Sequence, residues 1–237
     1  MMETNRERVR RELVSLITDA ARRQLAEVGP SAVSLRAVAR ELGLASSALY
    51  RYFPSRDALL AALIVDGYDA LGEAAEGASC TARRTRPGAR WLQVCRACRR
   101  WALEHPHEFA LLYGSPVPGY AAPETTTGPA GRVVAVMAQV LRDAHGTDDL
   151  RPPRQQIPHL PLVTPEVIGF AGLAQDPAYT DLVERSLVLW VVLMGSLSFE
   201  LFGHLENVVT DRAAWFDASM AVAAEGVGLR VPMGARR

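Results

Sequence analysis

The sequence predicts an all-α protein in which a small N-terminal head of three helices precedes a larger C-terminal helical bundle. Apolar residues recur at intervals of three and four over most of the first 76 residues, which is the period of an amphipathic helix. Gly43 and Pro54 interrupt this period at short intervals, as turns between short helices require. Two long, strongly apolar stretches near the C-terminus keep the helical period. We therefore expect a head with a connecting helix over 1–76 and a bundle over 77–237.

The first helix is expected over residues 6–28, because its apolar residues fall on one stripe and Gly29-Pro30 ends the pattern. The residues on this stripe are Val9, Leu13, Leu16, Ile17, Ala20, Ala21 and Leu25. Several arginines open the helix, namely Arg6, Arg8, Arg10 and Arg11. They could reach the phosphates of a nucleic acid as an arm or form a solvated helix end, and the sequence favours neither.

Two short helices joined by a tight turn follow. Ser34 suits the N-cap of the first, since its hydroxyl can accept from a backbone N–H two or three residues on. Gly43 suits the turn, and Pro54 ends a second helix expected over 45–53. The apolar face of the first helix comprises Leu35, Val38, Ala39 and Leu42. This arrangement predicts a helix-turn-helix, whose second helix enters the DNA major groove, although an ordinary helical hairpin with polar outer faces is the alternative.

The second of these helices carries residues suited to contact with DNA. Leu49 and Phe53, four positions apart, are expected to pack inward. The residues then left facing outward are Ser46, Ser47, Ala48, Arg51 and Tyr52. Small side chains allow close approach to base edges, and Arg51 can pair bidentately with guanine. Hydroxyl groups bond to phosphates and fix the register of docking.

The stretch from Gly43 to Arg56 resembles the signature of TetR-type transcriptional regulators. The shared pattern is Gly43-Leu44 with Ser46, followed by Leu49-Tyr50-x-Tyr52-Phe53-x-x-Arg56, and the resemblance extends over residues 9–64. It implies an all-α fold with an N-terminal helix-turn-helix DNA-binding domain and a C-terminal ligand-binding and dimerisation bundle. The resemblance assigns base contacts to Ser47, Ala48 and Arg51, and phosphate contacts to Ser34, Ser46, Tyr50, Tyr52 and Arg56. Arg56 stands where lysine is commoner in the family, and this keeps the positive charge.

Composition and charge agree with a soluble DNA-binding protein. The hydrophobic share of 49% and the charged share of 22% are typical of globular domains. The net charge of the whole chain is zero. The first 60 residues contain ten arginines and seven acidic residues, and the resulting positive charge favours contact with DNA. The three cysteines are odd in number, and the first residues are charged rather than apolar. We therefore expect a cytoplasmic protein with no disulfide framework and no signal peptide.

A connecting helix is expected over 56–76, a flexible connection over 77–88, and a further helix over 89–104. The last contains Cys95-x-x-Cys98, which could suggest a metal or redox site. A zinc site needs a second ligand pair at defined spacing, and a redox pair needs a strand–helix context. Neither accompanies these cysteines, which simply share one helix face. We expect them to pack in the core, and we expect no metal ion and no cofactor.

Residues 105–108 (His105-Pro106-His107-Glu108) break the helical pattern, and helices over 109–113 and 130–145 follow. The stretches 114–129 and 146–162 are rich in proline and glycine and are predicted to be loops. Compact domains rarely keep loops of this length without a use. The two loops could line a ligand entrance or could be tolerated insertions, and the sequence favours neither.

The last two helices, 179–204 and 211–227, are expected to form a dimer interface. Residues 187–202 are apolar nearly all round, and the apolar run is short of the ~20 residues that a membrane span requires. Such a helix is buried by its own domain on one side and by a partner on the other. In TetR-type proteins the last two helices pair with their copies, and this assigns 187–202 and 215–223 to a homodimer interface.

The resemblance also implies an effector site inside the C-terminal bundle. The side chains that could converge there are Trp101, His105, Phe109, Tyr113, Met137, Trp190 and Met194, with Trp91 as a further candidate. No cluster of opposite charge accompanies them, so we expect a largely apolar ligand, and plain core filling is the alternative for each residue. The stretch 190–195 loosely resembles a subfamily with Trp followed by His-Gly in this helix, with Met194 in place of the histidine.

These features predict a ligand-responsive transcriptional repressor, a homodimer that releases an inverted-repeat operator in double-stranded DNA when an apolar effector binds. A dimeric regulator without an effector is the alternative. An enzyme that uses His105, His107 and Glu108 as acid–base groups is a remote alternative, because no nucleophile–base pair, phosphate loop or metal pattern accompanies them.

Overall fold

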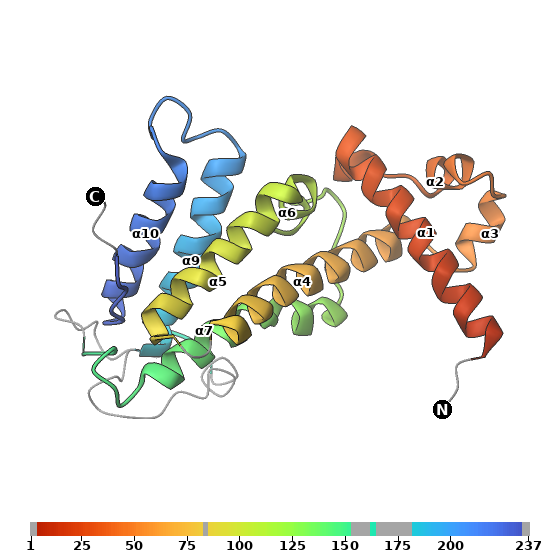
Figure 1. Ribbon diagram of the computed structural model, residues 1–237. Helices are drawn as coiled ribbons and strands as arrows, with labels where there is room; N and C mark the ends of the chain where they lie inside the picture. The colour runs from red at the N-terminus through yellow and green to blue at the C-terminus, as the bar shows by residue number, and fades with distance from the viewer. Residues whose placement is uncertain (1–3, 83–84, 153–161, 165–181, 234–237) are drawn as a thin grey trace. The chain divides into compact units, whose positions relative to one another are not determined.

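The computed structural model describes residues 4–82, 85–152, 162–164 and 182–233, and most of these residues are helical (Figure 1). The α-helices are α1 (Asn5–Val28), α2 (Leu35–Glu41), α3 (Ser46–Tyr50), α4 (Arg56–Thr81), α5 (Pro87–Glu104), α6 (Pro106–Tyr113), α7 (Thr127–Ala144), α9 (Leu182–Leu201) and α10 (Arg212–Gly226). Two short 3-10 helices, Pro30–Ala32 and Glu124–Thr126, lie between them. The described ranges contain no β-strand, only one isolated bridge between Leu150 and Leu229. The predicted all-α fold class is confirmed.

The chain forms two compact units that interleave along the sequence. One unit comprises residues 1–69 together with 105–130, and we call it the head unit. The other comprises 70–104 together with 131–237, and we call it the body unit. Helix α4 therefore runs from the head unit into the body unit, and α6 belongs with the head. The boundary that we expected at residues 76 and 77 falls inside α4.

The head unit has a core built by α1, α2, α3 and the first turns of α4. Its largest buried side chains come from all four helices and are Ile17, Leu25, Leu35, Val38, Leu49, Phe53, Leu59, Leu60 and Leu63. Gly43, between α2 and α3, has a φ of 66°, a conformation that costs glycine no steric clash. The predicted apolar faces are confirmed for the second half of α1 and for Leu35, Val38 and Ala39 of α2, but Val9 and Leu16 of the predicted α1 stripe are exposed.

Two details around α2 and α3 differ from the prediction. Ser34 stands at the N-cap of α2, but its side chain makes no capping hydrogen bond, and its backbone N–H instead donates to Oε1 of Gln24 at 3.3 Å. Helix α3 ends at Tyr50 rather than at residue 53. The chain continues as a turn, with the Tyr52 N–H bonded to the Leu49 carbonyl at 2.9 Å. Pro54 explains this early end, because the residue before a proline disfavours the helical conformation.

The helices after Pro54 are longer than predicted. Helix α4 continues to Thr81, so the first part of the connection expected over 77–88 is helical. Helices α5 and α6 begin with Pro87 and Pro106, and α7 begins at Thr127. Proline is accepted in the first turn of a helix, because its missing N–H would have no partner there. Prolines that we expected to break the chain therefore start helices.

In the body unit, helix α5 is tied to α9 and α10 by polar contacts. Arg99 of α5 donates from Nε and Nη2 to the carboxylate of Glu200 on α9, at 2.8 and 2.5 Å. Arg96 makes a similar forked pair with Asp217 of α10, at 3.0 and 2.7 Å. The Trp91 indole N–H donates to the carbonyl of Met220 at 3.1 Å. Because the Glu200 side chain is only 4% exposed, its charge depends on Arg99.

Cys95 and Cys98 are fully buried in the body unit, as predicted for core residues. Burial raises the pKa of Cys98 to about 12 and raises the pKa of Cys95 well above its ordinary value. Both thiols therefore stay protonated at neutral pH and behave as small apolar side chains.

Helix α9 is long and apolar enough to cross a membrane by length and composition, so our expectation that this run is too short does not hold. Its contacts are those of a core helix, however. One face packs against α5 and α10, and Glu200 on that face is paired with Arg99. An acidic side chain held by an arginine from a neighbouring helix fits a soluble bundle.

Removal of Arg99 should destabilise the body unit strongly. We expect Arg99→Ala to lower the free energy of unfolding by about 3 kcal/mol or more, because Glu200 is left buried without its partner. The double variant Arg99→Met/Glu200→Leu should recover most of this loss. Urea unfolding followed by circular dichroism at fixed protein concentration measures both. An effect of Arg99→Ala no larger than that of Arg8→Ala, which breaks an exposed pair with Glu12, would contradict the assignment.

Candidate nucleic-acid interface

Helix α3 presents one buried face and one exposed face. Leu49 is fully buried and Phe53 nearly so, which confirms their predicted inward packing. Ser47, Tyr50 and Arg51 are exposed. Among the described residues, the Arg51 guanidinium has neither an ion-pair partner nor a hydrogen-bond acceptor. A charged side chain left uncommitted beside small and hydroxyl-bearing residues can pair with a base or a phosphate.

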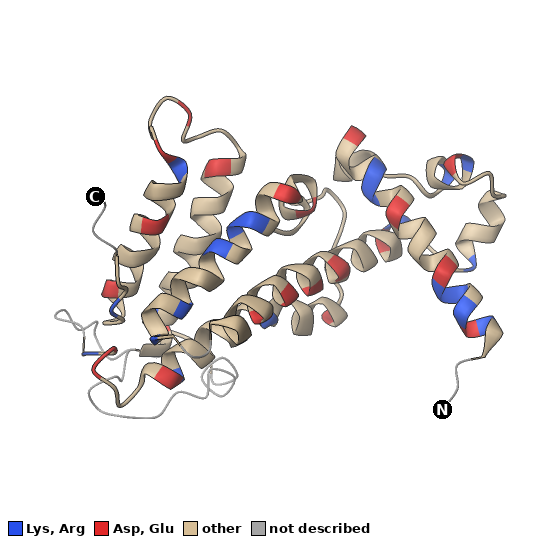
Figure 2. Ribbon diagram, in the orientation of Figure 1, with Lys and Arg blue, Asp and Glu red and all other residues tan. Residues whose placement is uncertain are grey.

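The other residues of α3, and Tyr52 in the turn after it, that we predicted to contact DNA are partly buried by the protein. Ser46, Ala48 and Tyr52 are half-buried, and Tyr52 also packs against the core of the head. The guanidinium of Arg10 lies over the Tyr52 ring, 5.7 Å from its centroid. This contact brings the arginine-rich start of α1, visible as blue ribbon near the N-terminus in Figure 2, beside the C-terminal end of α3. Arg10 is therefore a further candidate for phosphate contact, favouring the arm interpretation of this segment.

The Arg56 guanidinium forms hydrogen bonds to backbone carbonyls within the head unit. Its Nε donates to the carbonyl of Val33 at 3.2 Å and its Nη2 to the carbonyl of Pro30 at 2.8 Å. These bonds join the start of α4 to the connection between α1 and α2. The family resemblance assigned Arg56 only a contact with a DNA phosphate. A sequence motif does not show which backbone carbonyls lie close to this side chain in the folded protein. Its contact with DNA remains a prediction.

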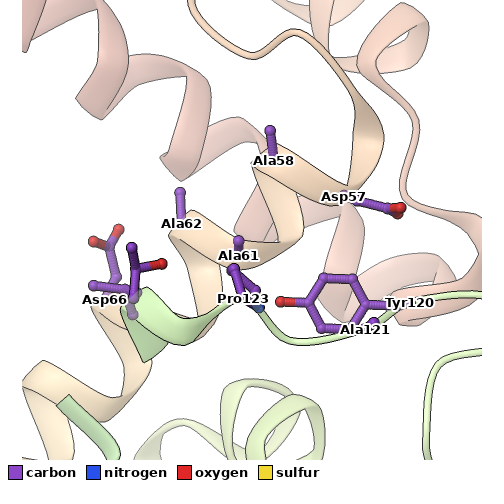
Figure 3. Close-up of a pocket in the computed structure, with 10 residues that line it drawn as sticks. Asp57, Ala58, Ala61, Ala62, Asp66, Tyr120, Ala121 and Pro123 are labelled. Atoms are coloured by element: carbon purple, nitrogen blue, oxygen red, sulfur yellow. The ribbon is translucent and has the colours of Figure 1, made fainter. Parts of the chain in front are cut away.

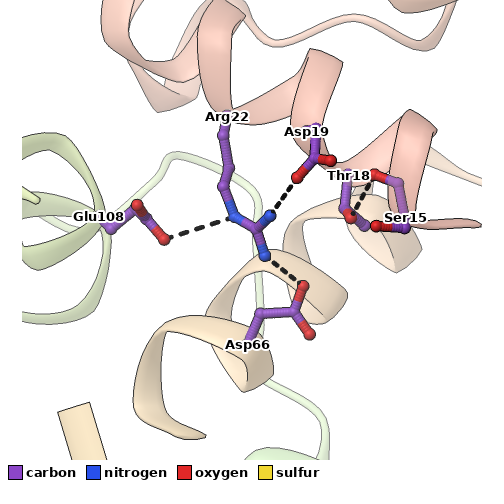
Figure 4. Close-up of polar contacts among 6 residues, drawn as sticks. All are labelled: Ser15, Thr18, Asp19, Arg22, Asp66 and Glu108. Atoms are coloured by element: carbon purple, nitrogen blue, oxygen red, sulfur yellow. Dashed lines mark hydrogen bonds and ion pairs between the residues drawn. The ribbon is translucent and has the colours of Figure 1, made fainter. Parts of the chain in front are cut away.

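A charged cluster joins α1, α4 and α6 within the head unit (Figure 4). Arg22 of α1 lies 2.7 Å from Asp19, 2.6 Å from Asp66 of α4 and 3.4 Å from Glu108 of α6. Glu108 is thus engaged in an ion pair, while His107 is exposed and His105 occupies the N-cap of α6. No group of three or more metal-ligating side chains occurs in the described part of the chain.

Each unit contains a cavity within its described residues. A cavity of about 570 Å³ in the head unit lies between α4 and the loop after α6 (Figure 3). A second, of about 520 Å³, lies in the body unit between α4, α5 and α7, and its lining includes Arg90, Arg132 and Arg142. Both volumes suit small-molecule ligands.

The seven residues predicted to bind a ligand do not line either cavity. His105, Phe109 and Tyr113 belong to the head unit, where the Phe109 and Tyr113 rings pack with centroids 5.1 Å apart. The residues of this set in the body unit are Trp101, Met137, Trp190 and Met194. Trp101, Phe109, Met137 and Met194 are buried, as core filling requires. The effector site inside the C-terminal bundle therefore remains a prediction.

The head core, the glycine turn and the exposed α3 define a helix-turn-helix DNA-binding protein with a helical body. The chain belongs to the TetR family of bacterial transcriptional regulators. The family described as "Bacterial regulatory proteins, tetR family" matches residues 17–63, and the "Tetracyclin repressor-like, C-terminal domain" matches residues 91–223. The predicted family is thereby confirmed, while the likeness of 190–195 to the Trp-His-Gly subfamily stays a prediction.

Similar proteins span nearly the whole chain. The HTH-type transcriptional regulator Rv1816 of Mycobacterium tuberculosis H37Rv is 37% identical over 218 residues, which cover 88% of this chain and 89% of that protein. The crystal structure of SCO4313, described as a regulatory protein, has a TM-score of 0.71 and 32% identity, covering 93% of this chain and 98% of that one. The structure of RolR with the ligand resorcinol, at 16% identity and a TM-score of 0.51, covers 95% and 98% and shows the shared fold.

Arg51 and Tyr50 should differ in what they contribute to DNA binding. We expect Arg51→Ala to cost about 1–3 kcal/mol and to relax sequence preference at one position per half-site, because it removes a base contact. Tyr50→Phe should weaken binding evenly across sequences, because a phosphate contact carries no base information. Binding titrations against an operator and its single-base variants measure both effects. An even loss for Arg51→Ala would show that Arg51 contacts phosphate only.

Arg56→Lys separates the internal role of this residue from a phosphate contact. The substitution keeps the charge, but the single nitrogen of a lysine cannot occupy the separate positions from which Nε and Nη2 of Arg56 donate to the two carbonyls. We expect the variant to lose about 1–3 kcal/mol of stability in the head, the value of hydrogen bonds from a charged donor. Hydrogen exchange of α2 amides measures this local loss. Unchanged exchange together with weakened DNA binding would assign Arg56 to phosphate alone.

Proposed function

We propose that this protein is a homodimeric transcriptional repressor that binds an inverted-repeat operator and is released from it by a small-molecule effector. The observation that carries the proposal is an apolar face on α9 and α10 that the body unit leaves exposed. Val188, Val191 and Phe199 of α9, and Phe202 directly after it, are each 45–59% exposed. They recur with Gly195 at intervals that place all five on one side of the helix.

Helix α10 continues this surface. Trp215 and Val222 are 36% and 73% exposed, and Ala218 lies between them on the same side of the helix. Helices α9 and α10 pack together within the body unit. A connected apolar face of this kind is unusual on a soluble monomer and marks an association surface. The face falls within the 187–202 and 215–223 segments that the sequence assigned to the dimer.

A symmetric dimer determines the form of the operator. Two copies that pair through the same face are related by a two-fold axis and present two identical α3 helices. The DNA they read must then contain two half-sites in inverted orientation. Binding of such a dimer to a promoter blocks access, which supports repression as the mode of control.

Effector control is supported by the family and by the cavities. RolR, a relative in fold, is described with resorcinol bound, and the described residues of this chain include cavities of suitable size in the head unit and in the body unit. A ligand can release DNA only if it binds more tightly to the conformation that does not fit the operator. A hundredfold preference corresponds to ~2.7 kcal/mol, within the usual range of allosteric coupling. We place the protein in the cytoplasm, where its DNA target lies.

Gly195→Leu tests the dimer face. In the isolated chain a Cβ at residue 195 meets no atom within 4 Å, and leucine favours helix more than glycine does. The substitution should therefore not harm the protomer, and any loss of assembly must come from a partner close to residue 195. We expect dissociation at micromolar concentration, measured by sedimentation, and weaker operator binding in proportion.

Gly77→Leu is the matched control, because Gly77 lies in α4, also has no atom within 4 Å of a built Cβ, and is off the apolar face. It should leave the dimer intact. A wild-type chain that sediments as a monomer, or a Gly195→Leu variant that dimerises like Gly77→Leu, refutes the proposed interface.

A further inference from the structure

The chemistry of the residues that line the head-unit cavity indicates which class of ligand it binds. We call it the Tyr120 cavity; its lining residues are Asp57, Ala58, Ala61, Ala62, Val65 and Asp66 of α4, and Tyr120, Ala121, Pro123 and Thr125 of the loop. Figure 3 shows Ala61 between Asp57 and Asp66 along the helix, with Tyr120 and Pro123 opposite. Small apolar side chains thus form the floor, and a carboxylate stands toward each end. The two carboxylates are nine positions apart on α4, about 13 Å along the helix axis.

No basic side chain is among the ten residues that line the Tyr120 cavity. A ligand that fills the cavity removes water from Asp57 and Asp66. Desolvation of a carboxylate costs free energy unless a positive charge or a hydrogen-bond donor replaces the water. The arginines that reach these carboxylates lie outside the lining: Arg56 is 3.8 Å from Asp57, and Arg22 is 2.6 Å from Asp66. A ligand that carries its own positive charge therefore replaces the lost water better than a neutral or anionic one.

Where Asp66 faces α1, its negative charge is only partly neutralised. Its carboxylate pairs with Arg22, but that single guanidinium is shared with Asp19 and Glu108 (Figure 4). Burial raises the pKa of Asp66, and the nearby Asp69 and Asp19 raise it further against the opposing effect of Arg22. Three carboxylates around one guanidinium leave a local excess of negative charge, which attracts a cation.

Tyr120 offers a polar contact that the protein does not use. Its hydroxyl is buried and has no hydrogen-bond partner among the described residues. In Figure 3 the hydroxyl is directed toward Pro123 and Ala61, into the cavity. A buried hydroxyl without a partner loses the hydrogen bonds it makes in water, so a ligand group that bonds to it is favoured. The aromatic ring also provides a face for a cation.

We propose that the Tyr120 cavity binds an organic cation, an ammonium or similar group on an apolar body, and that this cation is the effector of the regulator. The second part rests on the function proposed above. The apolar body covers the alanine floor, the positive group lies between Asp66 and the Tyr120 ring, and Asp57 attracts a second polar end. A cation at Asp66 competes with Arg22 of α1 for the same carboxylate. It thereby weakens a contact between the connecting helix and the DNA-binding helices.

The experiment uses three probes with the same body and different charge: 4-phenylbutylammonium, 4-phenylbutanol and 4-phenylbutyrate. Calorimetric titration of the full-length protein should show the ammonium binding at least about fivefold more tightly than the alcohol, and the carboxylate more weakly than both. Operator affinity should fall when the ammonium is added, and operator DNA should weaken ammonium binding by the same factor. Absence of ammonium binding, or a preference for the carboxylate, overturns the proposal.

Variants locate the site. Asp66→Asn should reduce the preference for the ammonium over the alcohol to less than about twofold, because it removes the anchoring charge. This ratio is insensitive to a fraction of unfolded protein, since both probes are measured on one preparation. Ala61→Leu should abolish binding of both probes by filling the floor. Glu73→Gln, the same acid-to-amide change on α4 outside the lining, is the control and should leave the ratio unchanged. An Asp66→Asn ratio equal to that of Glu73→Gln overturns the assignment.

The two proposals fail separately. A protein that selects an inverted repeat but does not distinguish the probes contradicts only the cation site. A protein that prefers the ammonium through Asp66 but shows no DNA preference contradicts the repressor function, while the cation site stands. Binding of the ammonium without any change in operator affinity overturns its role as effector.

Discussion

The packing of the first turns of α4 against the helix-turn-helix holds the head unit together. Leu59 and Leu60 of α4 are fully buried in the same core as Leu49 of α3. Arg56 adds hydrogen bonds to two backbone carbonyls between α1 and α2. Displacement of the first turns of α4 relative to α3 would open this core, so α3 and the start of α4 must move together. Helix α4 continues into the body unit, so one helix contributes both to the core that holds α3 and to the body unit.

The segment 105–130 completes the head, although it lies far from it in sequence. Leu111, Val117 and Tyr120 pack against the head core, and Glu108 contacts Arg22. The proline-rich loop after α6, for which the sequence left ligand entrance and tolerated insertion equally open, lines a cavity against α4. A ligand there would act on the same stretch of α4 that holds α3. An effector bound at the proposed site would share one compact unit with α3, so control would need no long pathway.

The parts of the fold that local chemistry determines were predictable. Periodicity, Gly43 and Pro54 gave the head helices, and the spacing of Leu49 and Phe53 gave the buried side of α3. The parts that depend on distant contacts were not. No local pattern shows that Arg56 bonds to the Pro30 carbonyl, or that Tyr120 and Ala61 line the same cavity, since these arrangements form only when the chain folds. The aromatic residues chosen as ligand contacts were conspicuous in composition, but large side chains mainly fill cores.

We propose that two copies of this chain read DNA through their paired α3 helices. The most direct test is selection of binding sites from a random duplex library by the purified protein at moderate salt, followed by sequencing. We expect enrichment of an inverted repeat whose half-sites are separated by about one helical turn or a multiple of it. Enrichment of single half-sites or direct repeats, or no sequence preference at all, would contradict it.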